Sequence, residues 1–70
     1  MPHDPILEMA ERHVREGEQR VLRQLQLVAE LEFTGRYETA RQARELLATL
    51  TESLDAAKVH LAHERRNASR

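Results

Sequence analysis

The sequence predicts an all-α fold, an antiparallel two-helix hairpin that pairs with a second copy as a four-helix bundle. Three observations lead to this prediction. The second half of the chain carries an unbroken heptad stripe of apolar residues, and a turn signal lies near the middle. The half of the first helix nearest the turn is apolar over a wider surface than one hairpin can cover. We expect one domain over residues 1–70, with helices at about 5–33 and 39–66, a turn at 34–38 and a disordered tail at 67–70.

The first helix has a clear beginning. Asp4 is expected to cap free backbone amides with its carboxylate, and Pro5 suits the first helical position, where no amide hydrogen is needed. Residues 1–3 are expected to be frayed. Along the helix, one apolar face is predicted from Leu7, Ala10, Val14, Gly17, Val21, Leu25 and Val28.

The turn is predicted around Gly35, because glycine suits the left-handed position that ends a helix. Thr39 is expected to cap the second helix, with Gln42 three residues later at the spacing of a capping box. Phe33 and Tyr37 flank the turn and are expected to pack over the closed end of the hairpin.

The second helix carries the stripe that should pack against the first. Its steps alternate between three and four residues, through Ala40, Ala43, Leu47, Leu50, Leu54, Ala57 and Leu61. A short connection makes the two helices antiparallel, so facing residues should have numbers that sum to about 71. In this register Gly17 lies opposite Leu54, and the missing side chain would let the helices approach each other.

A dimer is predicted because a chain this short buries a small core and has no cysteine for a disulfide. Self-association is the usual remaining route to stability. The predicted dimer interface consists of the apolar residues that one hairpin leaves uncovered, Leu22, Leu25, Leu27, Ala29, Leu31 and Leu46.

Charge and hydropathy narrow the function classes. The 11 basic residues nearly cancel the 12 acidic ones, which argues against strong nonspecific binding of nucleic acid. We expect no transmembrane helix and no signal peptide, and therefore a cytoplasmic protein that does not bind membranes. Three pairs with glutamate four residues before arginine indicate a solvated helix face: Glu8 and Arg12, Glu11 and Arg15, and Glu16 and Arg20.

The histidines offer one candidate for chemistry. His13, His60 and His63 lie near the open end of the predicted hairpin, where with Glu64 they could bind zinc or another divalent ion. They could equally form a pH-sensitive interface, or act as boundary residues that face water. Our prediction is the last of these, with no metal and no cofactor bound.

Nucleic acid is a second candidate. Arg12, Arg15, Gln19 and Arg23 recur at three- and four-residue steps and make a partly basic stripe, which a dimer would double. A dimer of helical hairpins with such a stripe resembles the RNA-binding plasmid regulator Rop in architecture and length. The resemblance implies an RNA-binding dimer, although glutamates lie between the arginines.

A third candidate rests on a local motif. The segment 51–55, from Thr51 to Asp55, resembles the Ser-x-x-x-Asp signature of Spo0E-type helical hairpins, which are phosphatases of response-regulator aspartyl phosphates. The resemblance implies that Asp55 would support hydrolysis, with Thr51 in place of the serine. The alternative is that Asp55 is an ordinary surface residue.

Most of the chain also resembles small, uncharacterised bacterial helical-hairpin proteins. The pattern lies in residues 13–18, Leu31-Glu32, Gly35, Thr39-Ala40 and Leu46-Leu47, and it implies the hairpin without an activity. Gly-rich phosphate loops, nucleophile elbows and HExxH motifs do not occur in the sequence. We therefore predict a non-enzymatic protein-interaction or regulatory module whose partners are a second copy and another protein.

Overall fold

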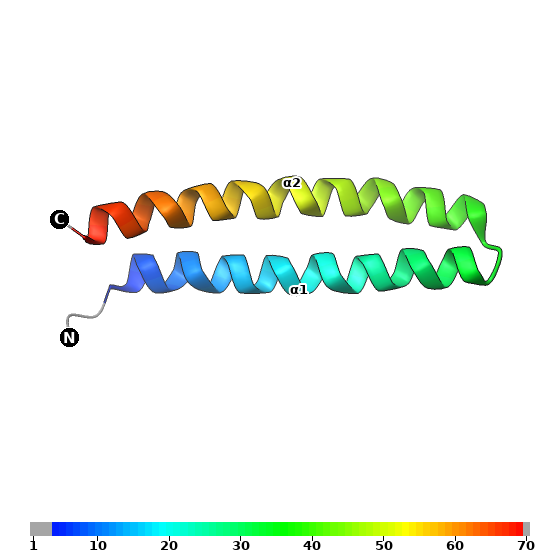
Figure 1. The fold of residues 1–70 in the computed structure, drawn as a ribbon, viewed down its shortest axis with the longest axis horizontal. Helices are drawn as coiled ribbons and strands as arrows, with labels where there is room; N and C mark the ends of the chain where they lie inside the picture. Colours follow the sequence, from blue (N-terminus) through cyan, green and yellow to red (C-terminus); the bar gives the residue numbers. More distant parts are fainter. Residues whose placement is uncertain (1–3, 70) are drawn as a thin grey trace.

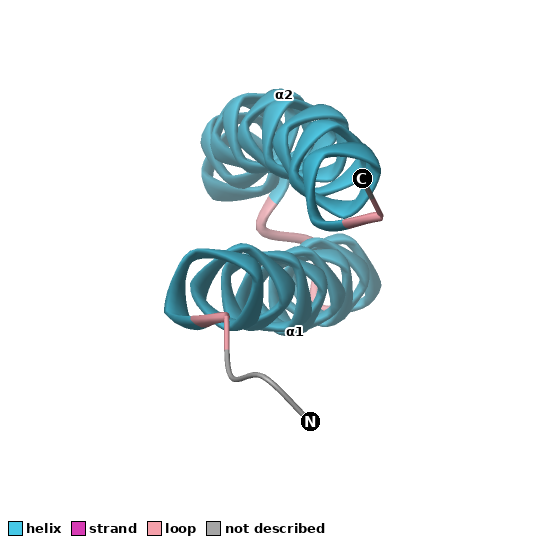
Figure 2. Cartoon of the chain, turned by 90° about the vertical axis from the view of Figure 1, so that its left-hand side faces the viewer, coloured by secondary structure: helices cyan, strands magenta, loops and turns pink. Residues whose placement is uncertain are grey.

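The chain folds back on itself as two antiparallel α-helices, in a computed structural model that describes residues 4–69 (Figure 1). Helix α1 spans Pro5–Phe33 and helix α2 spans Tyr37–Ala68. Viewed from its end, the molecule consists of these helices lying one above the other (Figure 2). The rod measures 52 × 18 × 11 Å, and the start of α1 and the end of α2 lie at the end opposite the turn. The predicted all-α hairpin is confirmed.

Helix α1 begins as the sequence predicts. The Asp4 carboxylate accepts hydrogen bonds from the backbone amides of Ile6 and Leu7, both at 3.1 Å, and Pro5 occupies the first helical turn. This cap satisfies amides that the helix itself leaves without acceptors. The predicted frayed segment, residues 1–3, lies outside the described residues.

The turn between the helices is a Schellman motif centred on Gly35, whose φ is 78°. The Gly35 amide donates to the carbonyl of Glu32 at 3.1 Å, and the Arg36 amide donates to the carbonyl of Leu31 at 2.8 Å. The predicted glycine position is therefore correct. The predicted Thr39 cap is wrong: Arg36 precedes α2, and its carbonyl already accepts from the Ala40 amide at 2.9 Å.

Replacing Gly35 by L-alanine is expected to destabilise the hairpin by about 1–2 kcal/mol, the cost of a left-handed backbone for an L-residue. No atom lies within 4 Å of the position where a Cβ would be, so this cost comes from the backbone alone. Urea unfolding measures the change. D-Alanine at the same position is the matched control, because it adopts positive φ without strain, and an equal loss with D-alanine would contradict this explanation.

Phe33 and Tyr37 do not pack over the closed end, as the sequence led us to expect. Phe33 is 92% exposed and Tyr37 is 70% exposed. The reason is helical geometry: Leu31 faces α2, and Phe33, two residues later, lies about 200° further round the helix. Both aromatic rings therefore project into solvent beside the turn.

Helix α2 continues further than predicted. Asn67 and Ala68 belong to the helix rather than to a disordered tail, and Arg70 lies outside the described residues. The last turn is stabilised by Ser69, whose hydroxyl donates to the carbonyl of Arg65 at 2.8 Å. Arg65 also places its positive charge near the negative end of the helix dipole.

The core is a seam between the helices in the predicted register. A Cβ built on Gly17 would lie 3.0 Å from Cδ1 of Leu54, so these two residues face each other. The buried residues form two clusters along the seam. Ala10, Val14, Leu54 and Leu61 make the cluster nearer the chain ends, and Val28, Leu31, Ala40 and Ala43 make the cluster nearer the turn.

Two predicted positions of leucines on α1 are wrong: Leu25 on the face that packs against α2, and Leu31 on the exposed dimer surface. Leu25 is 49% exposed, and the half-buried Gln24 takes its place in the seam, where its Nε2 donates to the carbonyl of Ala43 at 2.9 Å. Leu31, assigned to the exposed dimer surface, is only 7% exposed and packs against α2. Both corrections follow from regular three- and four-residue steps, which continue the seam from Val21 through 24, 28 and 31.

Candidate interaction surface

The exposed leucines lie on two different sides of the hairpin. Leu27 and Leu46 border a shallow groove above Ala43, close to the turn. Leu25 lies about 200° round α1 from Leu27, and Leu22 lies on the same side as Leu25. The six residues predicted as one dimer interface therefore do not form one surface. Leu27 and Leu46 make one strip, whereas Leu22, Leu25 and Ala29 make a second strip, and Leu31 is buried.

A second groove follows the first along the rod. It lies above Gly17 and Ala57, with Arg20 of α1 and Ser53 of α2 at its sides. Arg20 is seven residues before Leu27, so both lie on one side of α1. Ser53 lies seven residues after Leu46 on α2 in the same way. We call the side of the hairpin that carries both grooves the groove face.

The opposite side, which we call the charged face, is crossed by an ion pair between the helices. Glu32 of α1 and Arg44 of α2 approach to 3.2 Å, and both side chains are about half exposed. Seven-residue steps from these two positions place Glu18 of α1 and Lys58 of α2 on the same face. On α2, therefore, charged residues that border the seam lie on this side, whereas α1 carries charged residues on both sides, with Glu16 and Arg20 lining a groove on the groove face.

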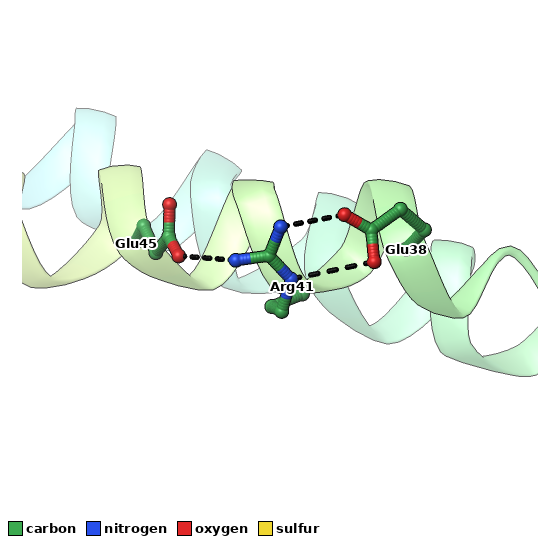
Figure 3. A network of polar contacts seen from close by, with 3 residues as sticks. All are labelled: Glu38, Arg41 and Glu45. Atoms are coloured by element: carbon green, nitrogen blue, oxygen red, sulfur yellow. Dashed lines mark hydrogen bonds and ion pairs between the residues drawn. The ribbon is translucent and has the colours of Figure 1, made fainter.

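An arginine on the outer side of α2 bridges two glutamates (Figure 3). The Arg41 guanidinium donates two hydrogen bonds to Glu38, at 2.5 and 3.3 Å, and a third to Glu45 at 2.6 Å. The Glu38 hydrogen bonds and then the Glu45 charge raise the pKa of Arg41 above its usual value. Because all three residues are exposed on one helix, the network supports α2 locally and does not hold the two helices together.

The candidate RNA-binding residues Arg12, Arg15, Gln19 and Arg23 are all exposed on α1. Acidic side chains accompany them: Glu16 lies 3.5 Å from the guanidinium of Arg12. Glu16 also pairs with Arg20 at 3.5 Å, which confirms one of the predicted glutamate–arginine pairs. The stripe is therefore a mixed-charge surface rather than a basic patch.

The candidate metal ligands do not converge. Within residues 4–69, no group of three or more His, Asp, Glu or Cys side chains is arranged to hold a metal ion. His63 instead contacts Asn67 of its own helix, with 3.2 Å between the ring Nε2 and the amide nitrogen. His13 lines the groove above Gly17, and His60 is exposed on α2.

The phosphatase-like motif lies on the surface of α2. Asp55 and Thr51 are both exposed. The Thr51 hydroxyl donates to the carbonyl of Leu47 at 2.8 Å, so the helix backbone already uses this group. The motif thus presents the carboxylates of Glu52 and Asp55 on the exposed surface of α2.

Within the described part of the chain, neither helix is long and apolar enough to cross a membrane. Comparisons with protein-family models, curated proteins and solved structures give no match. The resemblance to small bacterial helical hairpins and the cytoplasmic location therefore stay predictions.

Proposed function

We propose that this protein works as a homodimeric helical bundle, a non-enzymatic module for protein interaction or regulation. The observation that supports this proposal is the surface that one hairpin leaves uncovered. One chain exposes 5594 Å², whereas a folded monomer of 8.1 kDa is expected to expose about 4,500 Å². The excess, about 1,100 Å², is comparable to what one partner buries in a stable interface, about 800 Å².

The thin core supports the same proposal. The seam buries mostly alanine, valine and leucine, and none of the described side chains larger than alanine is completely inaccessible. A two-helix core of this kind contributes little stability at this chain length, and oligomerisation is a common way to add buried apolar area. Phe33, almost fully exposed at the tip, offers an aromatic anchor for a further protein partner.

Sedimentation equilibrium at micromolar concentration tests the proposal. The expected result is a helical species with twice the 8.1 kDa mass of one chain. A stable, helical monomer of 8.1 kDa over the whole concentration range would contradict the proposal.

RNA binding is the second candidate, supported by the exposure of Arg12, Arg15 and Arg23 on one helix. It is the weaker candidate, because Glu16 contacts both Arg12 and Arg20 and lowers the positive potential that attracts phosphates. If RNA is the ligand, wild-type protein should retain it at low salt, and replacing the three arginines by glutamine should abolish retention without loss of helicity. Absence of retention by the wild type would remove this candidate.

A further inference from the structure

We infer that the second copy docks on the groove face, with the turns of both hairpins at the same end of the bundle. This inference rests on the proposed dimer and specifies its interface. The first reason is the distribution of charge on α2. On the groove face, the positions of α2 that border the seam carry no Asp, Glu, Lys or Arg: they are Thr39, Gln42, Leu46, Thr49, Ser53, Ala56, His60 and His63.

These positions follow steps of three and four residues, the spacing of a stripe that packs against another helix. They lie one residue before each position of the seam stripe, so α2 has two adjacent stripes with helix-packing spacing. The charged residues of α2 gather on its other sides, as at Arg41, Arg44 and Lys58. In a chain that is 33% charged, an uncharged stripe of this length indicates a covered surface.

The shape of the groove face also fits a second helix. The groove near the turn is lined by Ala43, and the second groove is lined by Gly17 and Ala57, so each groove includes small residues of the seam. Leu27 and Leu46 stand at the sides of the groove near the turn. The face spans about 900 Å², given the 52 and 18 Å dimensions of the rod, which suits one partner's share of a standard interface.

The charges of α1 distinguish two possible orientations of the second copy. On the groove face, α1 carries Glu16, Arg20 and Glu30, which line grooves there, and Arg23, seven residues after Glu16, whereas the stripe on α2 has no Asp, Glu, Lys or Arg. A two-fold axis along the rod places α1 of one copy against α2 of the other, so each of these charges meets an uncharged residue. A two-fold axis across the rod would instead place α1 against α1, so that the charged residues of both copies share one helix pair and the two uncharged stripes share the other.

With the two-fold axis along the rod, each residue lies at the same level along the rod as the identical residue of the second copy. Leu27 and Leu46 line one groove and therefore share a level, so the two copies would combine four leucines in one layer. Arg20 and Ser53 line the other groove, so the guanidinium of one copy would lie beside a hydroxyl of the second copy. Such a layer of four leucines resembles the core of a helical bundle.

The test compares two matched pairs of substitutions. Leu27→Glu with Leu46→Glu changes the groove face, and Leu22→Glu with Leu25→Glu changes two equally exposed leucines on the other strip. Sedimentation should show a monomer for the first variant and a dimer for the second. A dimer for the first and a monomer for the second would overturn the inference and leave the proposed dimer intact, whereas a monomeric wild type would contradict the dimer itself.

Cysteine pairing tests the orientation independently of folding losses, because the natural chain has no cysteine. Chains with Leu27→Cys are mixed with chains carrying Leu46→Cys, and in a control with chains carrying Ser53→Cys. On mild oxidation the first mixture should form the mixed disulfide faster, since Ser53 lies about 10 Å further along the rod than Leu46. Equal rates, or a faster control, would overturn the arrangement with both turns at one end.

Discussion

Replacing Leu54 by alanine is expected to lower the free energy of unfolding by about 2–5 kcal/mol, the usual cost of truncating a buried leucine. Leu54 is 8% exposed and packs in the cluster of Ala10, Val14 and Leu61. A chain of this size has roughly 5 kcal/mol of stability in total, so the variant should be largely unfolded at ambient temperature. Circular dichroism during urea unfolding measures the loss.

Leu22→Ala is the matched control, because Leu22 is 56% exposed and lies on α1 away from the seam. Its effect on unfolding should stay within about 0.5 kcal/mol, as for most surface substitutions. Equal losses for the two variants would mean that the buried seam between α1 and α2 does not determine stability.

Replacing Gly17 by leucine should also destabilise the hairpin strongly. A Cβ alone would already approach Cδ1 of Leu54 to 3.0 Å, so a full leucine requires the Leu54 side chain or the helices to move. Overpacking of this kind costs about 1–3 kcal/mol, more than the gain of about 1 kcal/mol from replacing glycine in a helix. Thermal and urea unfolding would show the loss.

Combining Gly17→Leu with Leu54→Ala moves the large side chain from α2 to α1 and should recover part of this loss. The two substitutions should show a coupling of about 1 kcal/mol or more, because the residues touch across the seam. Additive losses would contradict the register in which these residues face each other.

The main features of the fold could be predicted because each depends on a local signal. Asp4-Pro5 begins a helix and Gly35 ends one, and the short turn then fixes the register that brings Gly17 to Leu54. The errors arose where residue type was given more weight than spacing. Leu25 was preferred to Gln24 in the seam, although the regular steps continue at position 24.

The candidate interface could be predicted only in part. Leucines were grouped by exposure, but their directions differ: Leu27 joins Leu46 on the groove face, whereas Leu22 and Leu25 lie on the other side of α1. The signal that could have separated them is the uncharged stripe of α2, which is visible in the sequence once the helix bounds are known. The grooves could not be foreseen, because they depend on how closely the small seam residues let α1 and α2 approach.

The most direct test of the dimer measures how thermal unfolding depends on protein concentration. If the uncovered surface of each hairpin is buried against a second copy, the midpoint temperature should rise as the concentration increases through the micromolar range. A midpoint independent of concentration, with the helix content unchanged, would show that one hairpin is stable alone and would contradict the account.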